Sequence, residues 1–364
     1  MKDIALDEDG DPVWNVAAGD QLVDGVVAWQ RLGVGLRCET WLGWSRPLWC
    51  AVAVKLPRPH QRTNVRARRS LGREVAALQD NPHPALPRLI SAALDEPLPY
   101  VGLEYIDGEP LDELAETQPL NATSTALLAT HLLAAVTPVH ARGIAHLDIK
   151  PENVVIRDAR PVLLDFGSAR PLDSWQPAGH PVGTVGYSAP EMEACEPISA
   201  AMDVYGIGAT LREAFTGFSP YDLDPRRRVL AARPPYPPGH PELVNLIRSM
   251  LAPLPVDRPT VPEALDSFAD LCEPADRPWP SWLSAAGPRE RRGKMEVMSK
   301  SRHDSGVPTF DDVRAKIEGR FAQADGQAEL DAVSTEGKQQ AQTTADRAAA
   351  AQAALDKIRA SLRE

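Results

Sequence analysis

The chain has few cysteines, and their spacing gives them no obvious structural role. Only four occur in 364 residues, at Cys38, Cys50, Cys195 and Cys272, and none forms a C-x-x-C pair. Scattered single thiols are typical of reduced proteins, whereas zinc sites and disulfide frameworks need closely spaced or paired cysteines. The sequence therefore argues against a zinc site and against a disulfide-stabilised fold.

A surplus of positive charge is also missing. The chain has 39 Lys and Arg against 50 Asp and Glu, a formal net charge of -11. Residues 273–364 carry 15 acidic and 15 basic residues, so the whole excess lies in residues 1–272. Because binding to a phosphate backbone needs a basic face, nucleic acid is not an expected partner.

The sequence shows neither a secretory signal nor an obvious membrane span. Its first residues, MKDIALDEDGDPVW, are acidic and lack the apolar segment of a signal peptide. No uninterrupted apolar run approaches the roughly 20 residues that cross a bilayer. We therefore expect a cytoplasmic protein without a transmembrane segment.

The amino-acid composition changes three times along the chain. We expect residues 1–20 to be a mobile acidic leader and residues 21–272 to be a globular domain with continuous apolar periodicity. Residues 273–306 are rich in proline and charge, as linkers are. Residues 307–364 form either two short amphipathic helices, which could self-associate or bind a partner, or a largely disordered tail.

Three apolar stretches at the start of the globular domain, VVAWQRLG, ETWLGW and CAVAVKL, have the texture of strands. Gly33 and Gly35 lie between the first two, where a backbone without Cβ can approach a phosphate and present its N–H groups. Lys55 ends the third stretch, at the rim of the predicted sheet. The helical pattern RARRSLGREVAAL then places Glu74 on an apolar face, where a carboxylate is costly unless paired, and Lys55 is the available partner.

The segment HLDIKPENVV, residues 146–155, places an Asp, a Lys and an Asn two and three residues apart. Asp148 can accept a proton from a hydroxyl, and Lys150 can neutralise charge on a group in transfer. Asn153 offers an amide oxygen to a hard cation such as Mg²⁺. Asp165 follows the strand-like run PVLL and precedes Phe and Gly, so it lies at a strand end before a sharp turn. Asn153 and Asp165 are therefore a candidate metal pair.

With the later motifs GTVGYSAPE, DVYGIGATL and DRP, this order and spacing resembles eukaryotic-type Ser/Thr protein kinases. The Ala- and Arg-rich, Lys-poor style resembles kinases of high-GC bacteria. The resemblance covers residues 21–272 and implies an α+β, bilobal fold, with a small β-sheet lobe carrying one helix and a larger helical lobe. It also implies transfer of the γ-phosphate of ATP, with Mg²⁺, to Ser and Thr hydroxyls of protein substrates.

The resemblance assigns roles to individual residues. It implies nucleotide contacts from Gly33, Gly35, Ala53, Lys55, Leu103, Glu104, Ile106 and Val155. It implies a catalytic set in which Asp148 is the base, Lys150 stabilises the γ-phosphate, Glu74 orients Lys55, and Asn153 and Asp165 bind Mg²⁺. As structural supports it implies Thr184 bridging toward Asp148 and Lys150, Glu191 paired with Arg258, and Asp203 anchoring the catalytic loop.

Two positions depart from the family pattern in ways that bear on function. Cys38 replaces the third glycine of the phosphate loop, which should stiffen that loop. Its thiol is either a candidate for oxidation or alkylation or an inert bystander. Leu147 stands where most such kinases have the Arg that meets an activation-loop phosphate. We therefore expect a kinase of the non-RD type, without this Arg, that does not depend on activation-loop phosphorylation.

Two other functions remain open at the level of sequence. The altered glycine loop favours a pseudokinase or scaffolding module, which would bind nucleotide and partners without efficient catalysis. Retention of the residues assigned to ATP, Mg²⁺ and the base opposes it. A kinase for small molecules is the other alternative, but such enzymes usually lack the protein-substrate platform that GTVGYSAPE, Asp203 and Arg258 would build.

Overall fold

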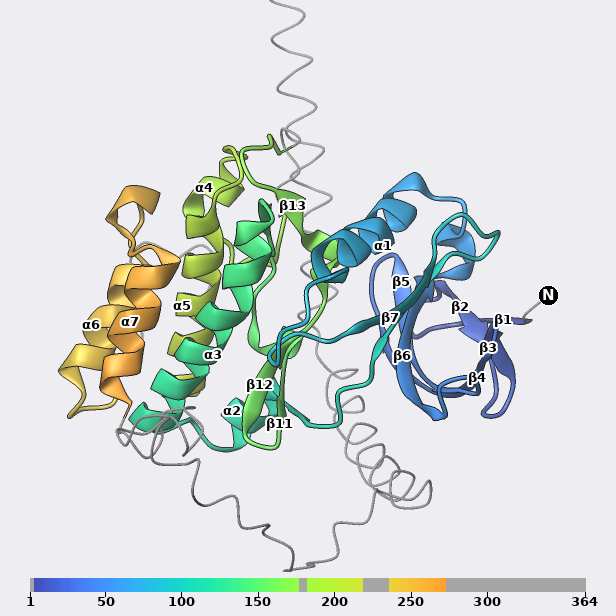
Figure 1. Cartoon of the computed structure of the whole chain (residues 1–364), viewed down its shortest axis with the longest axis horizontal. Helices are drawn as coiled ribbons and strands as arrows, with labels where there is room; N and C mark the ends of the chain where they lie inside the picture. Colours follow the sequence, from blue (N-terminus) through green and yellow to red (C-terminus); the bar gives the residue numbers. More distant parts are fainter. Residues whose placement is uncertain (1–2, 177–181, 219–235, 273–364) are drawn as a thin grey trace, which may run out of the picture. The chain divides into compact units, whose positions relative to one another are not determined.

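The computed structural model describes residues 3–176, 182–218 and 236–272. The predicted linker, 273–306, and the predicted tail, 307–364, lie outside the described residues, so both stay predictions. The expected α+β architecture is confirmed: a lobe built on a sheet with one long helix precedes a helical lobe (Figure 1).

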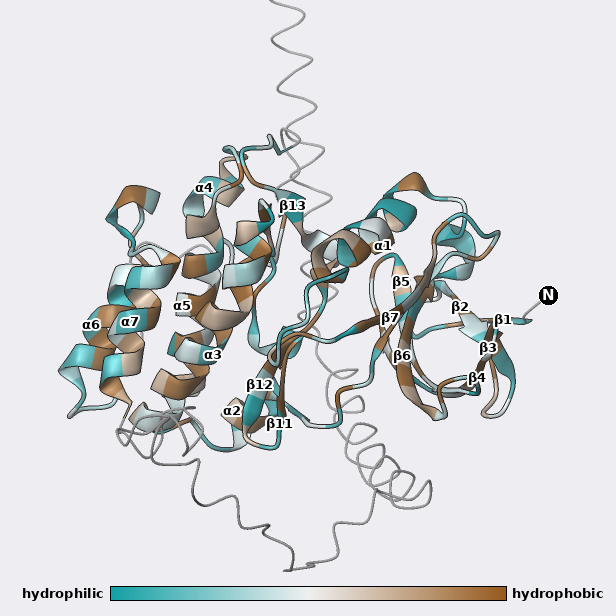
Figure 2. Cartoon of the chain, viewed as in Figure 1, coloured by the Kyte–Doolittle hydropathy of each residue, from teal (hydrophilic) through white to brown (hydrophobic). Residues whose placement is uncertain are grey.

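The first lobe is built on a six-stranded antiparallel sheet with strand order β3-β4-β5-β6-β8-β7. The strands are β3 (Gln21–Val23), β4 (Val26–Val34), β5 (Cys38–Ser45), β6 (Cys50–Pro57), β7 (Leu89–Ala93) and β8 (Tyr100–Glu104). The hydrophobic colouring of β6 in Figure 2 fits its position inside the sheet. Each face of the sheet is covered, because α1 contacts β6 and β8 and a separate apolar cluster includes Trp41, Val54 and Leu56.

Helix α1 (Val65–Leu78) begins where the sequence pattern predicts. The side chain of Asn64 caps it by accepting from the backbone N–H of Arg66, at 2.8 Å. Leu71 and Leu78 are buried on the face that meets the sheet, and Glu74 lies on the same face. The helix therefore carries a buried carboxylate toward the sheet, as its periodicity predicted.

The second lobe is mainly helical. Its helices are α2 (Leu111–Thr117), α3 (Ala122–Ala141), α4 (Pro190–Glu193), α5 (Ala200–Thr216), α6 (Pro241–Met250) and α7 (Val261–Leu271). Helix α3 packs against α5 and α7, and α5 also packs against α6. Short 3-10 helices lie at η1 (Pro59–Gln61), η2 (Pro151–Asn153), η3 (Phe166–Ser168) and η6 (Pro255–Asp257). The capping box predicted at the start of the last helix is present, with Thr260 and Glu263 as its two members.

Helix α3 is the one helix in the described part of the chain that is long and apolar enough to cross a membrane by length and composition. The sequence pattern predicted no apolar run of this length, because Thr and His residues interrupt the apolar pattern of α3. Ten of its residues are buried, among them Leu132, Leu133 and Val136. Burial between neighbouring helices explains its apolar composition.

Two small sheets position the loops between the lobes. Strands β9 (Glu109–Pro110), β11 (Val154–Arg157) and β12 (Arg160–Leu163) form one, in the order β12-β11-β9. Strands β10 (Ile144–Ala145) and β13 (Arg170–Pro171) form the other. Because β11 and β12 are antiparallel, the start of β11 lies beside the end of β12. The segment before β11 carries Asp148 and Asn153, and the segment after β12 carries Asp165.

The prediction of a mobile leader is wrong for residues 3–15. They form an antiparallel pair, β1 (Asp3–Leu6) and β2 (Pro12–Asn15). Val13 and Trp14 of β2 are buried, and Trp14 belongs to the same apolar cluster as Trp41. The acidic composition favoured an exposed, mobile segment, but burial of Val13 and Trp14 holds the segment against the first lobe.

A buried ion pair between Arg258 and Glu191 joins separate segments of the helical lobe. Arg258 donates to both carboxylate oxygens of Glu191, at 2.6 and 2.7 Å, as predicted from sequence. The same guanidinium also donates to three backbone carbonyls, those of Ala201, Ala252 and Pro253. The pair therefore ties the start of α4 to the start of α5 and to the chain before η6.

Replacing Glu191 by Ala should lower the free energy of unfolding by about 3–5 kcal/mol, because it leaves the buried guanidinium of Arg258 without its carboxylate. Urea unfolding measures the loss. As a matched control, Arg88→Ala removes the partner of Glu104 at an exposed position and should cost less than about 1 kcal/mol. Equal losses in the two variants would contradict the prediction.

Candidate active site

Lys55 lies between two carboxylates from distant parts of the chain. Its Nζ is 2.6 Å from Oδ1 of Asp165 and 3.2 Å from Oε2 of Glu74. Oε1 of Glu74 accepts from the backbone N–H of Phe166, at 3.3 Å. Strand β6, helix α1 and the turn at η3 thus meet at one ammonium group. The predicted pairing of Lys55 with Glu74 is present in the structure.

The charges of Lys55 and Asp165 stabilise each other, whereas burial raises the pKa of Glu74 although Lys55 opposes that shift. Burial opposes the charged form of Lys55, but the two carboxylates outweigh burial and raise its pKa. Burial also opposes ionisation of Asp165, and the Lys55 ammonium outweighs it, lowering the pKa of Asp165 to about 2. Both groups are therefore charged at neutral pH. The side chain of Asp165 is 46 % exposed, so the carboxylate remains accessible while one oxygen holds Lys55.

The glycine-containing segment is a hairpin between β4 and β5. Gly33 pairs with Thr40, and the N–H of Gly35 donates to the carbonyl of Cys38 at 2.8 Å, which closes the turn. Thr40 is directly opposite Lys55 in the next strand pair. The hairpin therefore lies beside the Lys55 cluster, where a phosphate-covering loop is expected.

The structure explains why Cys38 is tolerated where the family pattern has glycine. The residue begins β5 as an ordinary strand residue opposite Pro57, so no left-handed backbone conformation is required. Its side chain is buried in the same apolar cluster as Leu71 of α1. Burial raises the pKa of the thiol to about 11, with only partial relief from Lys55. A protonated, buried thiol is a poor nucleophile, which favours the inert interpretation.

The residues predicted to line an adenine slot come from both lobes. Ala53 and Leu103 are direct neighbours across strands β6 and β8, so they share one face of the sheet. Ile106 and Val155 belong to one small apolar cluster on the other side. Glu104 lies between these groups, and its side chain is held by Arg157 at 2.7 Å. The backbone N–H of Glu104 donates to the carbonyl of Arg88 at 2.8 Å, and the side chain is turned to the ion pair.

The segment 146–153 brings Asp148 to the same region. Thr184 donates its hydroxyl to Oδ1 of Asp148 at 2.6 Å, which confirms one of its two predicted partners, while the contact with Lys150 stays a prediction. Nδ2 of Asn153 donates to the backbone carbonyl of Asp148 at 2.8 Å. The backbone carbonyl of Asn153 accepts from the N–H of Leu164, at 2.7 Å, next to Asp165. Lys150 lies two residues beyond Asp148, immediately before η2.

The side chains of Asn153 and Asp165 fit a hard cation in their chemistry. Because Nδ2 of Asn153 is engaged with Asp148, its Oδ1 is the atom turned to other partners. Asp165 is ionised, and its backbone is left-handed, with a φ of 59°, which a strand end followed by a tight turn requires. One amide oxygen and one carboxylate are the oxygen ligands that Mg²⁺ takes from proteins beside phosphates and water.

A buried carboxylate from α5 holds the segment that carries Asp148. Asp203 accepts from the backbone N–H groups of His146 and Leu147, both at 2.8 Å. Nε2 of His140, in α3, lies 2.7 Å from Asp203. Burial opposes ionisation of Asp203, but His140 and the backbone donors outweigh it and lower its pKa. The prediction that Asp203 anchors this loop fits these contacts.

Sequence reasoning missed the part played by the two histidines around this loop. His140 belongs to none of the sequence motifs, yet it contacts Asp203. His146 is buried, its Nε2 lies 3.0 Å from the carbonyl of Leu164, and its ring meets that of Phe166 edge-on, at 4.5 Å. Because a carbonyl only accepts, Nε2 of His146 carries the proton. No sequence signal links these partners, since 63 residues separate His140 from Asp203.

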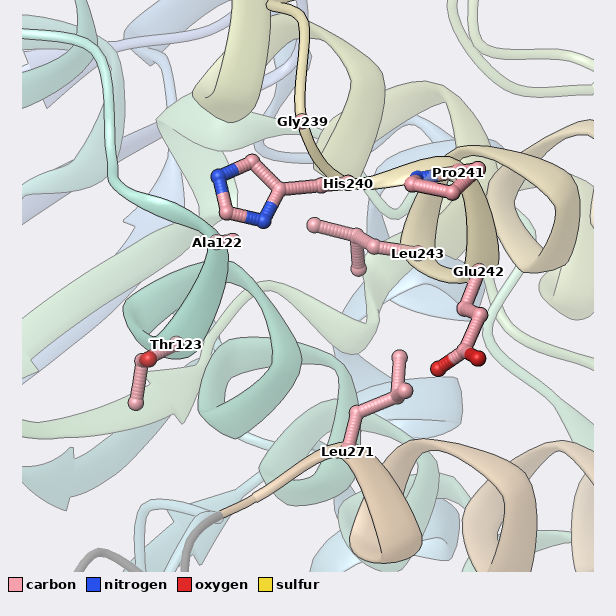
Figure 3. A pocket seen from close by; sticks show the side chains of 8 residues that line it. All are labelled: Ala122, Thr123, Gly239, His240, Pro241, Glu242, Leu243 and Leu271. Carbon is pink, nitrogen blue, oxygen red and sulfur yellow. The ribbon is translucent and has the colours of Figure 1, made fainter.

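A separate cavity of about 350 Å³ lies in the helical lobe, away from these residues (Figure 3). The residues around it are Ala122, Thr123, Gly239, His240, Pro241, Glu242, Leu243 and Leu271. They come from the start of α3, the start of α6 and the end of α7. None of the predicted site residues lies there.

Comparison with known proteins agrees with the fold. The sequence pattern of the protein kinase domain matches residues 27–268. The chain therefore belongs to the protein kinase family. All the predicted site residues, from Gly33 to Asp165, lie inside the matched range.

Curated relatives are bacterial kinases. The chain is 32 % identical over 242 residues to the probable serine/threonine-protein kinase PkwA of Thermomonospora curvata, covering 65 % of this chain and 32 % of the relative. It is 34 % identical over 200 residues to serine/threonine-protein kinase PkaA of Streptomyces coelicolor, covering 52 % and 37 %. The chain thus spans about a third of the length of the curated relatives that it matches.

A solved structure supports the fold. The PknI kinase domain of Mycobacterium tuberculosis matches with a TM-score of 0.55 at 24 % identity. The match covers 70 % of this chain and 99 % of that one. This comparison concerns the architecture, and the site is argued from the contacts above.

The raised pKa of Cys38 predicts slow alkylation in the native protein. With a pKa of about 11, roughly one thousandth of the thiol is thiolate at pH 8. Iodoacetamide labelling followed by peptide mass spectrometry should therefore modify Cys38 slowly, and much faster after unfolding in urea. Rapid labelling of Cys38 in the folded protein would restore it as a redox candidate.

Proposed function

We propose that this chain is an active serine/threonine protein kinase that uses Mg-ATP. The observation that carries the proposal is the meeting of Lys55, Glu74 and Asp165 beside the Asp148 segment. Phosphoryl transfer needs little covalent chemistry from a protein, and mainly requires positioning and charge neutralisation. Membership of the protein kinase family supports the same activity.

In this proposal each residue has a separate task. Asp148 accepts the proton of the acceptor hydroxyl, and the Thr184 hydroxyl holds its carboxylate at 2.6 Å in the correct orientation. Lys55 holds the α- and β-phosphates, with Glu74 fixing its position. Lys150 stabilises charge on the transferred group.

Asn153 and Asp165 would hold Mg²⁺, which supplies charge neutralisation at the phosphates when bound. Ala53, Leu103 and Val155 provide the apolar slot for adenine, with the backbone of Glu104 and Ile106 at its edge. Gly33 and Gly35 cover the phosphates. Protein Ser and Thr side chains are the acceptors.

The proposal is tested by transfer of labelled γ-phosphate from Mg-ATP to the chain itself and to a generic protein acceptor. We expect transfer by the wild-type chain and a loss of about 10²–10⁴-fold in Asp148→Asn, which removes the base. Thermal unfolding of both proteins with and without ATP provides the control for folding and binding. If wild type binds ATP but transfers nothing to either acceptor, the chain is a pseudokinase.

We also propose that activity does not depend on a phosphate in the activation segment. Leu147 has a left-handed backbone, with a φ of 69°, and its side chain is 4 % exposed. It lies in an apolar cluster with Ala145, Ala189, Met192, Ile198 and Met202. A side chain that packs in this way joins the catalytic loop to the segment around α4 by apolar contact. An Arg at this position instead relies on a phosphate partner.

Polar contacts support the same arrangement in the described parts of the activation segment. The side chain of Gln176 donates to the carbonyl of Glu196 at 3.0 Å and accepts from the N–H of Val182 at 3.2 Å. The backbone of Ile198 exchanges hydrogen bonds with Asp173 and Ser174, at 2.8 and 2.9 Å. The segment is therefore held at both ends by contacts that need no added phosphate.

If packing replaces phosphorylation, phosphate-free protein transfers phosphate from the first turnover, without a lag. Ser174 is half-buried, and its hydroxyl donates to the carbonyl of Pro171, three residues before it, at 2.6 Å. Ser174→Ala removes only this local bond and should leave the initial rate unchanged. Leu147→Arg should lower the rate at least tenfold, because it buries an unpaired guanidinium in the apolar cluster. A lag that pre-incubation with ATP removes, with the new phosphate found on the activation segment, would overturn this part of the proposal.

A further inference from the structure

The strand pair at the start of the chain lies outside the residues that match the kinase family, which begin at 27. Strand β2 nevertheless packs against the first lobe. Val13 and Trp14 are buried, and Trp14 shares an apolar cluster with Leu22, Trp41 and Leu56. By contrast, Ile4 and Leu6 of β1 are largely exposed. The contact with the kinase domain is therefore made by β2 and by the turn before it.

Glu39 makes this contact specific. It is the second residue of β5, directly after Cys38 of the phosphate-covering hairpin, and its side chain is fully buried. A buried carboxylate is costly unless it is hydrogen-bonded. Glu39 accepts from the backbone N–H of Trp14 at 2.9 Å and from the indole of Trp41 at 3.1 Å, and Arg31 lies 3.6 Å away. One of the donors that satisfy it thus belongs to β2.

Trp14 also reaches the neighbouring strand. Its indole Nε1 donates to the carbonyl of Pro57 at 2.7 Å. Pro57 is the residue opposite Cys38 in the pairing of β5 with β6, and Lys55 lies two residues before it. A single residue of β2 therefore bonds to both strands at the end where the phosphate-covering hairpin begins.

Arg58 provides a second attachment. Its backbone N–H donates to the carbonyl of Arg37, inside the hairpin, at 2.9 Å. Its buried guanidinium pairs with Asp7 at 2.5 Å and donates to the carbonyl of Pro12 at 3.2 Å. Asp11 lies 3.8 Å away. The acidic residues of the leader thus hold the side chain of Arg58, whose backbone N–H is bonded to the hairpin.

We propose that residues 7–14 are a clamp that positions the phosphate-covering hairpin over the nucleotide, so that Trp14, Glu39 and Arg58 are positioning residues for ATP. The clamp acts on the hairpin from the face opposite the cleft, because Glu39 and Trp41 alternate with Cys38 and Thr40 along β5. The inference rests on the nucleotide site of the proposed function. Without the clamp, the hairpin loses more conformational entropy when ATP binds, which weakens binding.

The test uses the full chain with Trp14→Ala, which removes the indole bond to Pro57 and the packing of β2. We expect the Kd for ATP, measured by titration without any acceptor, to rise about tenfold, equivalent to roughly 1.4 kcal/mol. The KM for ATP should rise in parallel, while the KM for the protein acceptor stays the same. Because binding is measured separately from transfer, the result stands even if the chain proves to be a pseudokinase.

A second variant leaves the apolar packing of Trp14 in place. Asp7→Asn with Asp11→Asn removes both acidic partners of Arg58 and should weaken ATP binding in the same direction, by a few-fold. Ile4→Ala, on the exposed strand β1, is the matched control and should leave the Kd unchanged. Phe268→Leu, in the helical lobe, controls for lost stability: it should lower the unfolding temperature without changing the Kd.

The inference is overturned if Trp14→Ala and the double Asp variant bind ATP as wild type does, whatever their stability. It is also overturned if Phe268→Leu raises the Kd as much as Trp14→Ala does. In either case β2 would be a packing element that stabilises the lobe without positioning the hairpin.

Discussion

The Lys55 ammonium is the interaction on which the geometry of the site depends. It lies in a partly buried place where a lone cation would be costly, and it is stable there because Glu74 and Asp165 both approach it. These partners belong to a helix and to a turn that are far from Lys55 in sequence. Satisfying one charge therefore fixes the relative positions of the sheet, α1 and the turn that carries Asp165.

A second carboxylate organises the loop that carries Asp148. Asp203 accepts two backbone N–H groups, one of them from Leu147, whose left-handed backbone costs about 1–3 kcal/mol by itself. The hydrogen bonds and the apolar burial of the Leu147 side chain offset this cost. The family pattern has a charged side chain at this position. In this chain Leu147 packs in an apolar cluster instead, and that cluster joins the loop to α4.

Apolar burial and hydrogen bonding also determine the arrangement of the first lobe. The phosphate-covering hairpin has lost one glycine, and Cys38 fits because its side chain finds apolar surroundings and its backbone stays in the strand conformation. The next residue, Glu39, points the other way and is satisfied by β2. A segment that precedes the family domain thus bears directly on the part of the domain that should cover ATP.

The sequence by itself determined the fold class and the order of the motifs, and it predicted the residues of the site, because phosphoryl transfer restricts which side chains can stand at each position. It predicted the pairs Lys55–Glu74 and Glu191–Arg258. Only the tertiary structure decided that His140 supports Asp203, that Cys38 is buried and that Trp14 reaches β5 and β6. Those partners are distant in sequence, and each contact arises from burial and backbone hydrogen bonding, which leave no motif.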